Sequence, residues 1–266
     1  MKPNILVIAG HDPSGGAGIH ADIEAIHSLG GFAATLITGL TVQNSQNVLG
    51  FELVSTDLLQ RQADALLADM RFDAVKIGMT GSPDIIAFIA RLLDRLPGVP
   101  VVLDPVLAAE AGGSLSGETV PTAMLRELMP RATLTTPNLP EAQKLAGTDT
   151  LDDCGARLLD AGCPAVLITG THDDTPEVRN HLYTTDGVQH WAWPRLPGTY
   201  HGSGCTLASA CAARLGAGLH LPTALAQAQD YVHSALRHAW QAGQGQLIPD
   251  RRTTRLTTHL TKGPAP

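Results

Sequence analysis

The sequence predicts an α/β fold in three layers, in which helices cover both faces of a mostly parallel central sheet. Short apolar runs alternate with amphipathic stretches, as strands do when helical crossovers connect them in parallel. The runs VVLD and AVLIT are almost continuously apolar, which is typical of strands buried on both faces. With 266 residues the chain can bury about 70% of its unfolded surface, and no linker or repeat divides it. We expect one domain over residues 1–266, with a polar, loosely held tail after Gln246.

The first half of the chain alternates expected strands and helices. It opens with an apolar run that predicts a buried strand, Asn4–Ala9, followed by a helix over Ala17–Leu29 and a strand over Ala33–Thr38. In Asp57–Asp69 the apolar residues recur near the 3.6-residue period of a helix. The next expected elements are strand Ala74–Ile77, helix Asp84–Arg95, strand Pro100–Asp104, helix Thr119–Leu128 and strand Ala132–Thr135.

The second half contains one hairpin among the helices. Asn180–Thr185 and Gln189–Trp193 are expected to pair across the turn-forming dipeptide Asp186-Gly187. The other expected elements are helices Leu139–Leu145 and Asp152–Ala161, strand Ala165–Thr169, and helices Ser203–Leu215 and Pro222–Trp240.

Composition excludes several classes of partner. The net charge of −7 gives no basic excess to neutralise phosphates, and only 4% of residues are aromatic, so we expect no nucleic acid. The N-terminal apolar run Ile5–Gly10 is too short for an export signal or a membrane span. Four cysteines without CxxC spacing indicate reduced thiols. We expect a cytoplasmic protein with a small-molecule ligand, no membrane contact and a homodimeric state.

Glycine and polar residues collect just after the expected strands. In open α/β sheets, ligands bind beyond the carboxyl ends of the strands, so these segments predict a ligand site. They are the loop GHDPSGGAG from Gly10, Gln43-Asn44, Lys76–Met79, Asp104–Val106, Thr136–Asn138, Thr169-Gly170 and His201–Cys205.

The first glycine-rich loop is open to several interpretations. Gly16-x-Gly18-x-x-Ala21 resembles a loose dinucleotide fingerprint, but no acidic residue follows about 20 residues later. A Walker loop is excluded because no Gly-Lys-Ser/Thr follows. A tight turn with positive φ explains several of the glycines by itself. Asp22, one turn into the helix, either faces a pocket or is a surface carboxylate stabilised by the helix dipole.

The turn Gly202-Ser203-Gly204-Cys205 precedes a helix of small residues. Successive glycines let backbone N–H groups converge, and the helix N-terminus adds positive charge, so the turn can build an anion hole for a phosphoryl group. The same field is expected to lower the pKa of Cys205, making it a thiolate or general base. The alternatives are a buried cysteine in a glycine cap, or a nucleophile with His201 as its base.

Two further groups have competing interpretations. Asn138 and Glu141 are three residues apart, so they could steer the waters of Mg²⁺ near nucleotide phosphates, or simply cap a helix. The 11 histidines are scattered, without metal-ligand spacing, and we interpret most of them as structural or surface residues. His172 and His201 lie near the expected site.

Taken together, the motifs resemble the ribokinase-like kinase family over about residues 4–242. The match is closest to its hydroxymethylpyrimidine/phosphomethylpyrimidine kinase branch of thiamine biosynthesis. The segments that carry it are AGHDPSGGAGIHADI, ITGLTVQN, VKIGM, VVLDPV followed by GGSL, TPNLPEA and HGSGCTLASA. The resemblance implies a ribokinase-like fold and a kinase that uses ATP and Mg²⁺. Its substrate would be 4-amino-5-hydroxymethyl-2-methylpyrimidine and then its monophosphate, giving the diphosphate.

The resemblance also implies a role for each matching residue. Cys205, where relatives that act on sugars place an aspartate, would be the base. Asn138, Thr169 and Gly170 would lie at the ATP phosphates. The remaining assignments are Gly10, Asp22, Gln43 and Met79 to the pyrimidine, Gly202, Ser203 and Gly204 to the anion hole, and Asp104 and Glu141 to Mg²⁺ through water.

One motif departs from the family pattern. The branch usually carries Lys-Gly-Gly-His where this chain has Thr169-Gly170-Thr171-His172, so the lysine expected over the phosphates is missing. A threonine hydroxyl can bond a phosphate but brings no charge, so another cation must neutralise the developing charge. A pyridoxal/pyridoxine kinase is the alternative within the fold, because that ring also carries a hydroxymethyl group. A cysteine hydrolase and a non-catalytic pyrimidine-binding descendant are alternatives of other classes.

Overall fold

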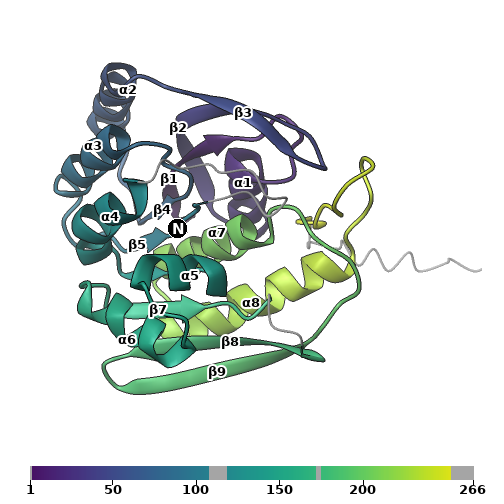
Figure 1. Ribbon diagram of the computed structural model, residues 1–266. Helices are drawn as coiled ribbons and strands as arrows, with labels where there is room; N and C mark the ends of the chain where they lie inside the picture. Colours follow the sequence, from purple (N-terminus) through teal and green to yellow (C-terminus); the bar gives the residue numbers. More distant parts are fainter. Residues whose placement is uncertain (1, 108–118, 172–174, 253–266) are drawn as a thin grey trace, which may run out of the picture.

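The strands of the protein join in one nine-stranded sheet, in a computed structural model that describes residues 2–107, 119–171 and 175–252 (Figure 1). The strands are β1 Asn4–His11, β2 Phe32–Gln43, β3 Val48–Leu53, β4 Ala74–Ile77, β5 Val101–Leu103, β6 Leu134–Thr135, β7 Ala165–Ile168, β8 Glu177–Thr184 and β9 Gly187–Pro194. Their order is β3-β2-β1-β4-β5-β6-β7-β8-β9. The strands from β2 to β7 in this order pair in parallel, and β3, β8 and β9 pair antiparallel at the two edges.

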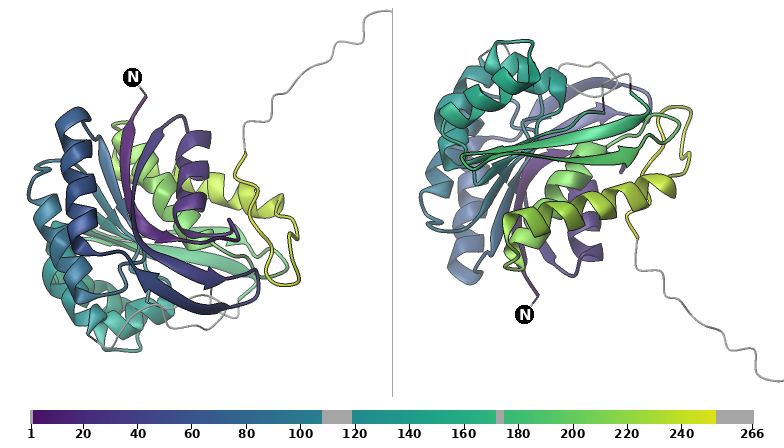
Figure 2. Two further views of the ribbon diagram at one scale, coloured as in Figure 1. Left: turned by 90° about the horizontal axis from the view of Figure 1, so that it is seen from above. Right: turned by 90° about the horizontal axis from the view of Figure 1, so that it is seen from below.

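Helices pack against both faces of this sheet (Figure 2). They are α1 Gly18–Ser28, α2 Thr56–Asp69, α3 Pro83–Leu93, α4 Val120–Ala123, α5 Leu139–Ala146, α6 Leu151–Asp160, α7 Ser203–Gly216 and α8 Leu221–Arg237. Because side chains alternate along a strand, β1 serves two cores: Leu6 and Ile8 pack toward α2 to α6, whereas Ile5, Val7 and Ala9 pack toward α1, α7 and α8. The predicted three-layer α/β fold is confirmed.

Two local predictions need correction. The stretch Thr119–Leu128 is not one α-helix: after α4 the chain continues as a π-helical turn over Met124–Leu128 and a 3-10 turn over Met129–Arg131. Pro130 has no N–H to donate, so a regular helix cannot continue through this turn. The sequence analysis also missed β3, an edge strand whose residues are half-buried or exposed and whose apolar residues are interrupted by Gly50 and Glu52.

The tail was expected to be loose after Gln246, and this is wrong for the residues up to Arg251. Leu247 pairs with Tyr200 and Ile248 with Trp240 through isolated β-bridges. Ile248 and Arg251 are buried, at 4% and 1% exposed. The expected last helix also stops at Arg237, because the backbone of Trp240 bonds to Ile248 instead.

Parts of the sequence-based analysis lie outside the described residues. These are the GGSL segment at residues 112–115, His172, and the end of the tail beyond residue 252. Within the residues that the structure describes, no helix is long and apolar enough to cross a membrane.

Candidate active site

A cavity of about 650 Å³ lies at the carboxyl ends of the parallel strands, where the sequence places its glycine and polar segments. The predicted site residues that line it are Gly10, Gln43, Met79, Asp104, Asn138, Glu141, Thr169, Gly202, Ser203, Gly204 and Cys205. Asp22 and Gly170 do not line it. Seven chain segments far apart in sequence therefore converge on one concavity, as expected for a ligand site.

The glycine-rich loop after β1 folds around one carboxylate. Asp12 accepts from the backbone and hydroxyl of Ser14 at 2.8 and 2.7 Å, and from the backbone of Ala17 at 2.8 Å. Its Oδ2 also lies 2.8 Å from Nε2 of His201. Burial raises the pKa of Asp12, but the bonds from His201 and Ser14 outweigh it and lower this pKa below its usual value. Gly15 and Gly18 have φ of 76° and 57°, so the tight-turn interpretation of these glycines is confirmed.

The turn before α7 lines the cavity with residues at the start of that helix. Gly202 is the N-cap with φ of 80°, and a Cβ there would collide with the carbonyl of Gly16 and lie 2.9 Å from Cα of Ala17. Only glycine fits this close approach of the two loops. Gly202, Ser203 and Gly204 line the cavity at the N-terminus of a 14-residue helix, where the helix dipole favours an anion.

A buried cluster of charges forms part of the cavity wall. The ammonium of Lys76 lies 2.8 Å from Oδ1 of Asp22 and 3.7 Å from Oδ2 of Asp104. Burial by itself lowers the pKa of Lys76, but the two carboxylates outweigh it and raise this pKa. Burial also raises the pKa of Asp104, and the ammonium offsets only part of that rise. Sequence analysis assigned no role to Lys76; the available signal was a lysine inside the otherwise apolar strand AVKI.

Asp22 has neither of the two positions expected for it. It is fully buried, so the interpretation as a surface carboxylate is wrong. It accepts a 2.6 Å hydrogen bond from the hydroxyl of Ser209 and pairs with Lys76, which itself lines the cavity. Asp22 therefore does not line the cavity itself, but contacts Lys76, which does.

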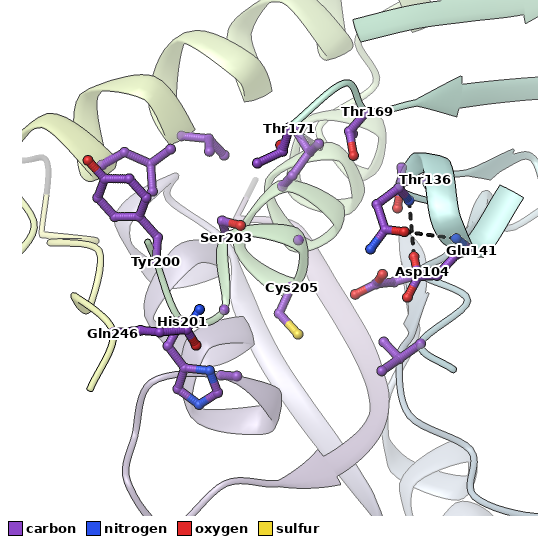
Figure 3. A pocket seen from close by; sticks show the side chains of 18 of the residues that line it. Asp104, Thr136, Glu141, Thr169, Thr171, Tyr200, His201, Ser203, Cys205 and Gln246 are labelled. Carbon is purple, nitrogen blue, oxygen red and sulfur yellow. Dashed lines mark hydrogen bonds between the residues drawn. The ribbon is translucent and has the colours of Figure 1, made fainter. Parts of the chain in front are cut away.

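Cys205 projects into the cavity between the glycine turn and Asp104 (Figure 3). Its thiol was expected to have a lowered pKa, and this is wrong: burial, with the carboxylates of Asp104 and Asp22, raises the pKa to about 12, against the opposing effect of Lys76. The thiol is therefore protonated at neutral pH and bonds to Asp104. His201 does not assist it, because Nε2 of His201 contacts Asp12.

Asn138 and Glu141 form a capping box at the start of α5. Asn138 Oδ1 accepts from the backbone of Glu141 at 2.9 Å, and Glu141 Oε2 accepts from the backbone of Asn138 at 3.0 Å (Figure 3). The helix-cap interpretation is confirmed. Both residues also line the cavity, with Asp104 and Thr136 beside them, and the buried hydroxyl of Thr136 has no hydrogen-bond partner among the described residues. Capping therefore does not remove these side chains from the site.

The segment after β7 is held by a hydrogen-bond network in the cavity wall. The backbone of Thr169 donates to Pro137 at 3.0 Å, and the backbone of Gly170 donates to Asn180 Oδ1 at 3.2 Å. Asn180 in turn donates to Gln229 at 2.9 Å. Thr169, Asn180 and Gln229 line the cavity, whereas Gly170 does not, so only Thr169 of the predicted pair is a lining residue.

Comparison with known proteins agrees with this geometry. The model of the phosphomethylpyrimidine kinase family matches residues 12–250. Hydroxymethylpyrimidine/phosphomethylpyrimidine kinase of Escherichia coli (strain K12) is 37% identical over 243 residues, covering 89% of this chain and 91% of that protein. The phosphomethylpyrimidine kinase structure from Clostridium difficile 630 is 32% identical, with a TM-score of 0.78, covering 88% of this chain and all (100%) of that one.

A kinase for another ring is also similar in structure. The pyridoxal kinase of Staphylococcus aureus in complex with pyridoxal has a TM-score of 0.88 at 26% identity, covering 96% of each chain. The same kinase has been solved with ADP and with AMP-PCP.

Proposed function

The chain belongs to the phosphomethylpyrimidine kinase family, and we propose that it phosphorylates 4-amino-5-hydroxymethyl-2-methylpyrimidine and then its monophosphate, with ATP, in thiamine biosynthesis. The observation that carries this proposal is the single cavity that joins the glycine turn before α7 to Gly10, Gln43 and Met79. A phosphoryl acceptor at Gly10, Gln43 and Met79 and an anion hole at the glycine turn would therefore share one site. Phosphoryl transfer depends mainly on such positioning and on electrostatic stabilisation.

The pyrimidine would lie against Gly10 and Met79. A Cβ at Gly10 would come within 2.7 Å of the sulfur of Met79, so this sulfur packs directly on the bare backbone and forms a flat apolar wall. Gln43 donates through Nε2 to the hydroxyl of Thr41 at 2.7 Å, which directs its amide oxygen to accept from the ring amino group. Asp22 would not contact the pyrimidine. It would hold Lys76 in place at the cavity wall beside the substrate.

Transfer to the hydroxymethyl group requires removal of one proton. The substrate oxygen attacks the γ-phosphorus of ATP, the bond to ADP breaks, and backbone N–H groups of Gly202, Ser203 and Gly204 stabilise the charge on the transferred group. We assign the role of base to Cys205, which receives the substrate proton as its own proton passes to Asp104 beside it. The second step uses a phosphate oxygen as nucleophile, which at neutral pH needs little help from a base.

The residues of the site fit a nucleotide with Mg²⁺. Mg²⁺ in proteins keeps several of its waters beside carboxylates and substrate phosphates. The carboxylates of Asp104 and Glu141 both line the cavity and would hold the ion through such waters, which leaves Asp104 able to accept the proton of Cys205. Bound there, Mg²⁺ would neutralise charge on the phosphates. Asn138 and the hydroxyl of Thr169 would contact the phosphates from the same wall. The structures of the pyridoxal kinase with ADP and AMP-PCP support the use of ATP.

We also propose a cytoplasmic homodimer. All four cysteines are free thiols, as in reducing compartments. The hairpin of β2 and β3 exposes Leu40, Val42 and Leu49 by 51%, 59% and 73%, which is an apolar surface that a second copy could cover. Light scattering should give twice the chain mass, and replacing Leu49 and Val42 by charged residues should give the chain mass. A monomeric wild-type protein would contradict this proposal.

Competition between two ring substrates tests the proposed activity. The pyridoxal kinase neighbour makes pyridoxal the second candidate, because its fold matches at a TM-score of 0.88. Equal concentrations of the pyrimidine and pyridoxal, with limiting Mg-ATP, should yield mainly phosphorylated pyrimidine by mass spectrometry. A higher kcat/KM for pyridoxal would refute the proposed substrate and leave the kinase activity standing.

A further inference from the structure

The segment that ends the described chain carries a buried arginine to the back of the site. Arg251 is 1% exposed, although its neighbour Arg252 is a surface residue whose side chain is 78% exposed. The segment is held in place by hydrogen bonds from the backbone of Asp250 to Ala235 at 3.0 Å and from the hydroxyl of Tyr231 to the carbonyl of Arg251 at 2.9 Å. The backbone that carries the guanidinium is therefore held by α8.

The guanidinium bonds to both loops that meet at the cavity. Its Nη2 donates to the carbonyl of Gly16 in the glycine-rich loop, and its Nε donates to the hydroxyl of Thr206 in the first turn of α7 at 2.8 Å. That hydroxyl donates in turn to the carbonyl of Gly202 at 2.7 Å. A Cβ added to Gly202 would lie 3.0 Å from Nη2, so the guanidinium is packed directly behind the turn.

We propose that Arg251 is a positioning residue that clamps the glycine-rich loop to the phosphate-binding turn of α7. The two loops have no covalent connection near the site, yet the substrate must lie between them for the phosphoryl group to reach it. Arginine suits the position because its rigid fork of donors bonds to several acceptors at once. Its positive charge also lies behind the turn that we assign to the anion hole, with Glu24 at 3.1 Å as a partner that is partly exposed and hence screened.

Hydrogen exchange tests the clamp without relying on activity. In Arg251→Gln, peptides covering residues 12–18 and 201–207 should both exchange about tenfold faster or more, since charge-assisted hydrogen bonds to both are lost. The matched control, Arg252→Gln, should leave both unchanged. Unchanged exchange in Arg251→Gln, or a rise that is equal in the peptides of β1 and β4, would overturn the clamp. If Arg251→Gln does not fold, the same exchange measurement is made on Arg251→Lys. Faster exchange in both loop peptides is again the expected result.

Steady-state kinetics test whether the clamp positions the two loops for phosphoryl transfer. This kinetic test rests on the proposed function. At a temperature where the variant is folded, Arg251→Gln should lower kcat about tenfold or more, with a much smaller change in KM for the pyrimidine. Added guanidinium ions should restore part of kcat in Arg251→Gln and none in Arg252→Gln. A wild-type kcat, or a loss without rescue, would overturn the positioning role. A wild-type enzyme that phosphorylates no pyrimidine would refute the proposed function, while the exchange experiment would still decide the clamp.

Discussion

The pairing of Lys76 with Asp22 predicts strong coupling between two substitutions. Both side chains are 0% exposed and their charged atoms are 2.8 Å apart. Lys76→Met leaves Asp22 and Asp104 buried without their cation, and removing one partner of a buried pair costs about 3–5 kcal/mol in the free energy of unfolding. With a slope of about 3 kcal/mol per M, this loss shifts the urea midpoint down by about 1–1.7 M.

The double variant Lys76→Met with Asp22→Asn tests the reasoning behind that magnitude. It removes both charges of the pair, so its cost should be about 2–3 kcal/mol smaller than the sum of the two single costs. Urea unfolding of the wild type, both single variants and the double variant gives the coupling energy. Costs that add within about 0.5 kcal/mol would refute the conclusion that this ion pair determines the stability of the cavity wall.

Three further predictions follow from the site. Cys205→Ala should lower kcat about a hundredfold for the hydroxymethyl substrate and much less for its monophosphate, because only the first step needs a base; equal losses in separate ADP-release assays would contradict this. Thr169→Lys should keep or raise the rate with Mg-ATP, because it adds a cation beside the phosphates; a large fall in kcat would show that this chain needs the hydroxyl itself. Asp12 has a pKa lowered from 3.8, so its ionised form stabilises the fold at neutral pH and this contribution is lost as pH falls through the folded-state pKa. The stability difference between the wild type and Asp12→Asn should therefore shrink below about pH 4 in urea titrations, and a constant difference would contradict the assignment.

The sequence predicted the sheet and the location of the site well because both depend on local patterns. Apolar runs such as Ala74–Ile77 identify buried strands, and parallel strands bring their carboxyl ends to one edge wherever the connections are helical. The order of the motifs along the chain then placed almost every predicted residue on one cavity. The N-cap role of Asn138 was equally local, because a capping box needs only three residues of separation.

The features that sequence analysis missed are long-range. Lys76 lies in β4 and Asp22 in α1, and the two side chains meet only in the folded chain. No local pattern in the sequence shows that this lysine contacts a carboxylate. Arg251 has no local pattern that indicates burial, because it bonds to the carbonyl of Gly16, 235 residues earlier in the chain. The raised pKa of Cys205 has the same origin, because burial and two distant carboxylates outweigh the opposing effect of Lys76.

A time course with purified wild-type protein, Mg-ATP and 4-amino-5-hydroxymethyl-2-methylpyrimidine tests the central claim most directly. ADP release and the mass of each product are followed together. We predict that the monophosphate appears first and is then converted to the diphosphate, with one ADP released at each step. Accumulation of the monophosphate alone would contradict the second activity, and the absence of any phosphorylated pyrimidine would contradict the proposed function as a whole.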